Sequence, residues 1–124
     1  MKPAVRSALA QADVEAALDY YGSEAAHAAV GFIDALEQAT AHIQRHPGTG
    51  SPQYAHELNL AQLRYWPLTR YSNALFYIEH DDHVHVVRVV HMSRDIPVTL
   101  RAQRRANSPT AFNYAFWIGL GEVV

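Results

Sequence analysis

The first half of the chain carries hydrophobic residues at the spacing of amphipathic helices. After Ala10 they recur three or four positions apart, which is typical of a helix with one buried face. The residues of this first seam are Val14, Ala17, Leu18 and Tyr21. Gly22 then predicts the end of the helix, and Ser23 is a candidate N-cap for a second helix.

The second helix has its own hydrophobic seam. The seam comprises Ala25, Ala29, Phe32, Leu36, Ala39 and Ile43. It is followed by the sequence HPGTGSP, whose prolines and glycines predict the end of the helix. A link of about two residues makes neighbouring helices run antiparallel. Residues 11–46 are therefore predicted to form a helical hairpin with one hydrophobic face to cover.

The second half changes to short hydrophobic runs that are typical of β-strands. Strands are predicted over residues 62–66, 73–80 and 84–91, and residues 3–6 are a candidate edge strand. A tight turn at Asp81 and Asp82 predicts an antiparallel hairpin of the last two strands. Asp95 as a cap and Pro97 at the first helical position predict a short helix after them. The arginines of that helix are Arg101, Arg104 and Arg105.

The last predicted strand carries an arginine within a run of valines. The residues predicted to share one face with Arg88 are Val84, Val86 and Val90. Because valines also occupy the other face, the strand is predicted to be central. A lone buried charge costs several kcal/mol, so Arg88 has to meet a carboxylate. The two candidates are Glu79 on the neighbouring strand and an acidic side chain of a partner. The following Arg94 and Asp95 are predicted to form a local salt-bridged turn.

Length and composition predict a single domain. The chain has 124 residues, no cysteine, and no hydrophobic run near the roughly 20 residues of a membrane-spanning helix. We expect a soluble, cytoplasmic protein with one domain over residues 1–124 and a core over about residues 3–105. The predicted fold class is α+β, with an N-terminal strand and an antiparallel helical hairpin packed on a small antiparallel β-sheet.

The apolar C-terminal tail, residues 106–124, extends this domain. Its sequence TAFNYAFWIGL is strongly hydrophobic, and its aromatic residues alternate as in a strand. The segment is predicted either to join the sheet edge or to dock on a partner chain. The tail residues predicted to bind a partner are Phe112, Tyr114, Phe116 and Trp117.

Positive charge is concentrated in the second half. Residues 63–124 hold seven arginines against five acidic residues, whereas residues 1–62 hold three basic residues against seven acidic ones. An anionic partner is therefore expected at the second half. His83 and His85, with the nearby His80, Asp81 and Asp82, are considered as metal ligands. Because they flank an exposed turn, we interpret them instead as polar strand ends, and we expect no metal or cofactor.

Three stretches carry a family resemblance: ADVEAALDYY, AVGFIDALEQATAHIQRHPGTGSP and LRYWPLTRYSNALFYIEHDDHVHVVRVVHMSRDIPVTL. In order and spacing they resemble the ParE branch of the RelE/ParE toxin family of bacterial toxin–antitoxin modules, over about residues 5–100. The residues that carry the resemblance are Asp13 with Tyr20 and Tyr21, His46-Pro47, Leu63-Arg64 with Pro67-Leu68, Phe76-Tyr77, and His91 with Arg94-Asp95.

The resemblance implies a small toxin that a co-encoded antitoxin, ParD-like or another small protein, neutralises by wrapping its sheet and helices. ParE-like members act on DNA gyrase, and RelE-like members cut messenger RNA on the ribosome. Cleavage of RNA needs an acid, a base and cations around one phosphate. The candidates for that role are Arg64, Arg70, Arg88 and His91. Residues 53–62 hold no lysine or arginine, and Lys2 is the chain's single lysine. Gyrase inhibition is therefore predicted, and ribosome-dependent RNA cleavage is the alternative.

The partners implied are the antitoxin and DNA gyrase. We expect no membrane partner and no sequence-specific binding of nucleic acid by the toxin alone. Besides the tail aromatics, the residues predicted to bind a partner are Arg64, Arg70, Arg88, His91 and Arg94.

Overall fold

The computed structural model describes residues 1–106, with side chains up to Arg101. The elements are β1 (Ala4–Arg6), α1 (Ala8–Glu24), α2 (Ala26–Arg45), the 3₁₀ turn η1 (Pro47–Thr49), β2 (Leu63–Pro67), β3 (Asn73–Glu79), β4 (Val84–His91) and α3 (Ile96–Ala106). The predicted α+β class is confirmed. The predictions for the tail residues 107–124 lie outside the described residues.

The four strands form one sheet in the order β1-β4-β3-β2. The hairpin of β3 and β4 and the pairing of β2 with β3 are antiparallel. The N-terminal β1 runs parallel to β4, with Ala4 opposite Val84. The strand over 84–91 is therefore central, as its valine pattern predicts.

The helical hairpin is confirmed, but its corner lies elsewhere than predicted. Helix α1 continues through Gly22 to Glu24, and α2 begins at Ala26. Ala25 is thus the single residue between the two helices. A glycine inside a helix costs only about 1 kcal/mol, so Gly22 does not end α1. Ala25 is extended and donates its amide to Tyr21 O. The predicted N-cap Ser23 instead donates its hydroxyl to Tyr20 O within α1.

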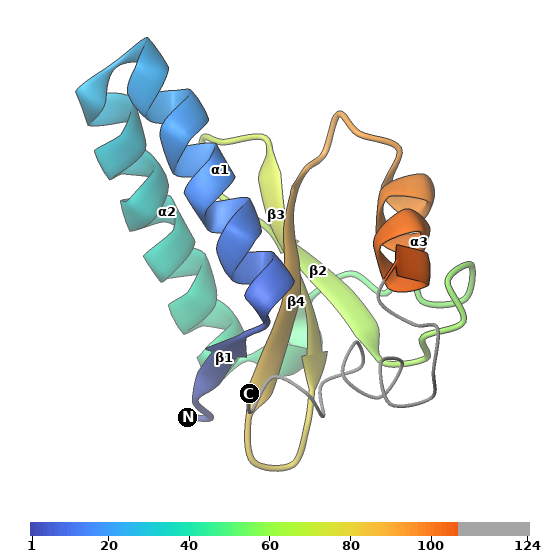
Figure 1. The fold of residues 1–124 in the computed structure, drawn as a ribbon. Helices are drawn as coiled ribbons and strands as arrows, with labels where there is room; N and C mark the ends of the chain where they lie inside the picture. The colour runs from blue at the N-terminus through green and yellow to red at the C-terminus, as the bar shows by residue number, and fades with distance from the viewer. Residues whose placement is uncertain (107–124) are drawn as a thin grey trace.

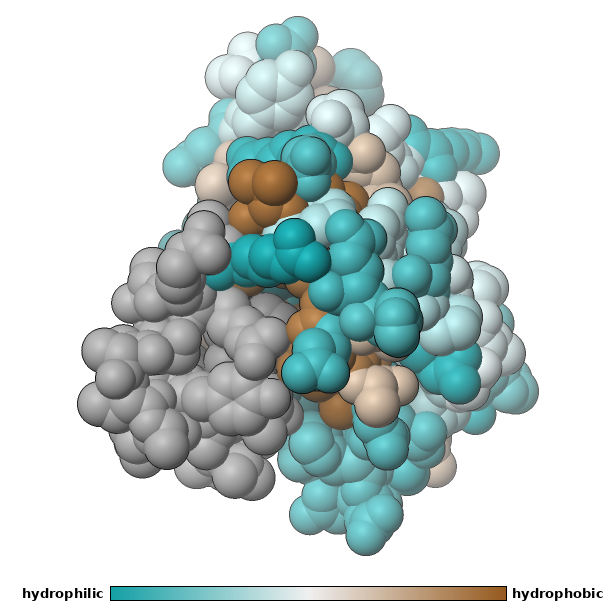
Figure 2. Space-filling view, turned by 90° about the vertical axis from the view of Figure 1, so that its right-hand side faces the viewer, coloured by the Kyte–Doolittle hydropathy of each residue, from teal (hydrophilic) through white to brown (hydrophobic). Residues whose placement is uncertain are grey.

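The sheet has helices on both of its faces (Figure 1), and a hydrophobic core lies on each face. Helices α1 and α2 cover one face, and α3 with the segment 52–60 covers the other. Phe32, Ile43 and Tyr77 are fully buried in the first core, and Phe76 and Leu100 in the second. Seen from the α3 side, the coloured surface is mostly hydrophilic with small hydrophobic areas between the polar side chains (Figure 2).

A β-bulge changes the predicted faces of β4. Tyr77 lies opposite Val86 and Phe76 lies opposite Arg88, so Val87 is an extra residue. Beyond the bulge the alternation is reset, and Val90 belongs to the core under α3 whereas Val86 belongs to the core under the helical hairpin. The prediction that Val90 shares a face with Val86 is therefore wrong.

In the described part of the chain, none of the helices has the length and hydropathy needed to span a bilayer.

Candidate functional site

The outer edge of β4 is closed first by β1 and then by the start of α1. Strand β1 ends at Arg6, and the next residue, Ser7, donates its amide to Val86 O at 3.0 Å. The Ser7 hydroxyl donates to Val87 O at 2.9 Å and accepts the Ala10 amide at 3.0 Å. Ser7 thus pairs with the strand edge and is also the N-cap of α1.

Asp13 closes the next part of this edge. Its carboxylate accepts the Val89 amide at 3.0 Å and forms a two-point ion pair with Arg88, with Nε–Oδ2 at 2.6 Å and Nη2–Oδ1 at 2.9 Å. Arg88 is only 5% exposed. The internal ion pair anticipated for Arg88 therefore exists, but Glu79 is the wrong partner. Glu79 binds Lys2 Nζ at 2.6 Å instead.

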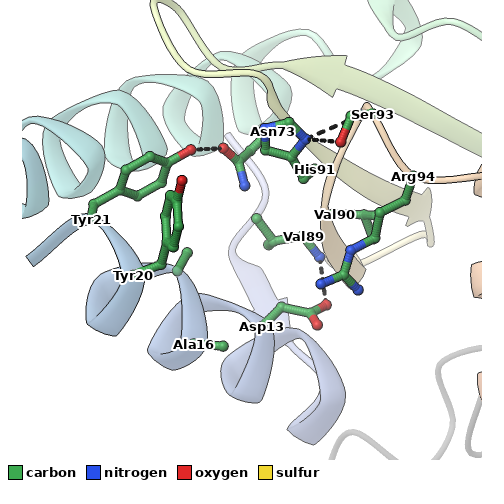
Figure 3. Close-up of a pocket in the computed structure, with 11 residues that line it drawn as sticks. Asp13, Ala16, Tyr20, Tyr21, Asn73, Val89, Val90, His91, Ser93 and Arg94 are labelled. Atoms are coloured by element: carbon green, nitrogen blue, oxygen red, sulfur yellow. Dashed lines mark hydrogen bonds between the residues drawn. The ribbon is translucent and has the colours of Figure 1, made fainter. Parts of the chain in front are cut away.

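Beyond Asp13 the edge opens into a cavity of about 400 Å³ between α1 and the end of β4. Its floor is formed by Val89 and Val90, and α1 supplies small residues, Ala16 and Ala17, along one wall. Figure 3 shows Asp13 at one side of this cavity, with the Arg94 side chain extending towards it. The small side chains of α1 leave room beside the strand.

The opposite wall holds a buried amide. Asn73 is 6% exposed and lines the cavity. Its Oδ1 accepts the Tyr21 hydroxyl at 2.7 Å. This hydrogen bond fixes the orientation of the side chain, so its NH₂ group points into the cavity (Figure 3). Among the described residues, the Asn73 NH₂ group has no hydrogen-bond acceptor.

Two tyrosines near the end of α1 differ in their surroundings. Tyr21 packs between Phe32 and Tyr71, with ring centroids 5.3 and 5.0 Å away. Burial raises the pKa of Tyr21, and the neighbouring Tyr20 and Tyr71 hydroxyls raise it further. Tyr20 is 62% exposed and stands at the mouth of the cavity.

The turn after β4 brings a histidine, a serine and an arginine to the cavity. His91 Nδ1 accepts the Ser93 amide at 3.1 Å and lies 2.7 Å from the Ser93 hydroxyl. Asp95 accepts the Val98 amide at 3.0 Å and so begins α3. The predicted Arg94–Asp95 salt bridge is wrong: within the described residues the Arg94 side chain has neither an ion pair nor a hydrogen bond.

The four candidate nuclease residues are not brought together. Arg64 lies on β2, with β3 between it and β4, and donates from Nη1 to Gly50 O at 2.8 Å. Arg70 lies exposed in the turn between β2 and β3 with a φ of 73°. Arg88 is buried against Asp13, and only His91 reaches the cavity. Two of the predicted partner-binding residues, His91 and Arg94, therefore share one site.

Three further residues of this site were not predicted as functional. Asp13 and Tyr20 were noted only as carriers of the family resemblance, and no pattern marks Asn73, which reads as an ordinary residue at the start of a strand. Their proximity comes from α1 crossing the edge of β4, a tertiary arrangement that periodicity does not predict.

The histidines near the turn between β3 and β4 do not form a polar surface patch. His85 is fully buried, and the rings of His80 and His83 are stacked with centroids 4.7 Å apart. The hydrogen bond with His83 lowers the pKa of Asp82. In the part of the chain that the structure describes, no three His, Asp or Glu side chains are arranged to hold a metal ion.

Known proteins are similar to this chain in fold and in sequence pattern. A solved structure titled "Chromosomal ParDE TA system from P. aeruginosa" is similar in fold, with a TM-score of 0.62 and 17% identity, over 73% of this chain and 96% of the other. No curated protein sequence matches the chain. The family model described as "ParE toxin of type II toxin-antitoxin system, parDE" matches residues 5–96. The chain therefore belongs to the ParE toxin family of type II toxin–antitoxin systems.

Proposed function

We propose that the protein is a toxin that blocks DNA replication in the cytoplasm by binding and inhibiting DNA gyrase, and that a co-encoded antitoxin neutralises it. Family membership supports the toxin role and an antitoxin partner. The choice of gyrase over RNA rests on one observation: the candidate basic residues lie apart from one another on a sheet whose two faces are both covered.

Covered faces matter because RNA cleavage needs an open surface with converging groups. An acid, a base and cations have to lie within hydrogen-bond reach of one phosphate. Here α1 and α2 cover one face, and α3 with the segment 52–60 covers the other. Arg64 and Arg88 are already bound to a backbone carbonyl and to a carboxylate. Such a molecule is better suited to act through its surface than through a reaction centre.

The test compares two purified systems. The toxin should inhibit supercoiling by gyrase and should leave messenger RNA intact in a translating extract. Addition of the antitoxin encoded next to the toxin should restore supercoiling, which is the control for specific inhibition. Cleavage of messenger RNA at codon positions, with supercoiling unaffected, would contradict the proposal and favour the RelE-like alternative.

The antitoxin is proposed to bind residues that remain available at the surface. Arg94 and His91 in the cavity, and Arg70 in its exposed turn, are suited to acidic groups. Arg64 is half-buried and offers only part of its guanidinium. Arg88 is proposed to contribute indirectly, because its ion pair holds Asp13 and so the near wall of the cavity.

A further inference from the structure

The last residues of β4 leave two backbone groups open towards the cavity. Along a strand, backbone groups alternate between the two neighbouring sides. The Met92 amide donates to Ser72 O, on the β3 side, whereas the Val89 amide faces outward to Asp13. Val89 O and the His91 amide therefore also face outward. In the described part of the chain neither has a hydrogen-bond partner.

These two groups match one residue of a parallel strand. In a parallel ladder a single residue donates to the carbonyl of one residue and accepts from the amide two positions later. Val5 of β1 already occupies such a position opposite His85. Strand β1 leaves the sheet at Ser7, which begins α1. Beyond the contact of Asp13 with the Val89 amide, the edge of β4 therefore has room for a second parallel segment. One residue of that segment would lie opposite Val90.

The side chains around the open groups are mainly donors. Arg94 has no ion pair within the described residues, and the buried Asn73 points its NH₂ group into the same cavity. Among the described residues that line the cavity, Asp13 is the one carboxylate, and it is already bound to Arg88 and to the Val89 amide. A carboxylate would therefore find complementary charge here, and a positively charged side chain would not.

We propose that this cavity binds one acidic residue of an extended antitoxin segment that runs parallel to β4. The residue donates its amide to Val89 O, accepts the His91 amide, and pairs its carboxylate with Arg94. The cavity of about 400 Å³ accommodates such a residue. The inference rests on the proposed function only in taking the segment from the antitoxin.

The experiment uses a blocked amino acid as the probe. N-acetyl-L-glutamate N-methylamide and the corresponding glutamine derivative are titrated into the ¹⁵N-labelled toxin and followed by NMR. The glutamate derivative should give saturable shifts at the His91 amide and the Asn73 side-chain amide, and the glutamine derivative should not. Arg94→Gln should weaken the binding about tenfold, because one charge-assisted hydrogen-bonded pair is lost. Arg6→Gln, an exposed arginine of β1, is the matched control and should change nothing.

The results separate the inference from the proposed function. Equal binding of both derivatives, or shifts that do not include His91, would overturn the inference even if gyrase is inhibited. Binding of the glutamate derivative without inhibition of gyrase would overturn only the proposed function. Saturation with the antitoxin should abolish the response to the probe. An antitoxin complex that responds like the free toxin would overturn the assignment of the cavity to the antitoxin.

Discussion

One stretch of the outer edge of β4 is covered by the protein's own chain, and the next stretch is open. From Val84 to Val89 the outer edge of β4 is closed by β1, by Ser7 and by Asp13. From Val89 O to His91 it faces a cavity. An open strand edge can pair with another chain, so proteins usually cover it. The difference indicates that α1 protects the edge up to Asp13 and leaves a short, defined section for a partner.

The two arginines beside this edge show the same difference. Arg88 is buried and needs its carboxylate, because a buried charge without a partner is strongly destabilising. Arg94 is exposed, so water can solvate it in the absence of a partner. The closed section should therefore determine stability and the open section should determine binding. The following predictions test that division, from the largest expected loss of stability to the smallest.

Asp13→Ala should have the largest effect. It leaves Arg88 buried without a counter-charge and removes the acceptor of the Val89 amide. The free energy of unfolding, measured with urea, should fall by about 3 kcal/mol or more. Glu15→Ala, an exposed acidic residue on the same helix, should change it by less than about 0.5 kcal/mol.

A double substitution separates the ion pair from general damage. Asp13→Leu with Arg88→Leu replaces both charges by hydrophobic side chains. It should be less destabilising than Asp13→Ala alone, because no uncompensated charge remains. If the double variant is less stable than Asp13→Ala, the Asp13–Arg88 ion pair would stabilise the fold by more than the cost of leaving Arg88 buried without a counter-charge.

Ser7→Ala should come second. The variant loses the N-cap of α1 and the hydrogen bond to Val87 O, both in a buried position. We expect a loss of about 1–2 kcal/mol in the free energy of unfolding. Ser23→Ala, which removes an exposed hydroxyl at the other end of α1, should have almost no effect. Equal losses for the two serines would contradict the role given to Ser7.

Tyr21→Phe should cost about 1 kcal/mol, because the hydrogen bond that orients Asn73 is lost. It should also change the response to alkali. The pKa of Tyr21 is raised above its ordinary value of 10.0, so the folded protein keeps this proton to higher pH than the unfolded chain. Its contribution is complete below about pH 10 and is lost as the pH rises further. Above that pH, the melting temperature should therefore fall less steeply with rising pH in the variant than in the wild type.

Arg94→Gln should have the smallest effect on stability, within about 0.5 kcal/mol of the wild type, because the side chain makes no ion pair in the described structure. Its effect should appear only in binding, as the weaker affinity for the glutamate probe. A melting temperature that falls by several degrees would show that Arg94 belongs to the closed section after all.

The sequence was sufficient to predict the helices and strands, and to predict that buried Arg88 needs a carboxylate. It was not sufficient to predict which residue supplies that carboxylate. Hydrophobic spacing predicted the hairpin and the central strand, and burial predicted that Arg88 has a carboxylate. Glu79 was named as the internal candidate, beside an acidic side chain of a partner, because neighbours on a β-hairpin are the contacts that a sequence suggests. Asp13 lies 75 positions from Arg88 and reaches it only because α1 crosses the edge of β4.

Local signals also misplaced two features. Gly22 and Ser23 suggested the corner of the hairpin, yet the chain turns at Ala25, which has no side-chain cap. The bulge at Val87 has no mark in a run of valines, so the faces beyond it could not be assigned.

The parallel pairing of β1 with β4 has a consequence for the order of folding. Ala4 pairs with Val84, 80 positions later, since 84 − 4 = 80. At a synthesis rate of about 5–20 residues per second, Ala4 is synthesised roughly 4–16 seconds before Val84. The first strand to be made is therefore among the last to be paired, and Ser7 and Asp13 can bind the edge of β4 only at that late step. Until then the nascent chain holds α1 and α2 with a hydrophobic face that no sheet covers.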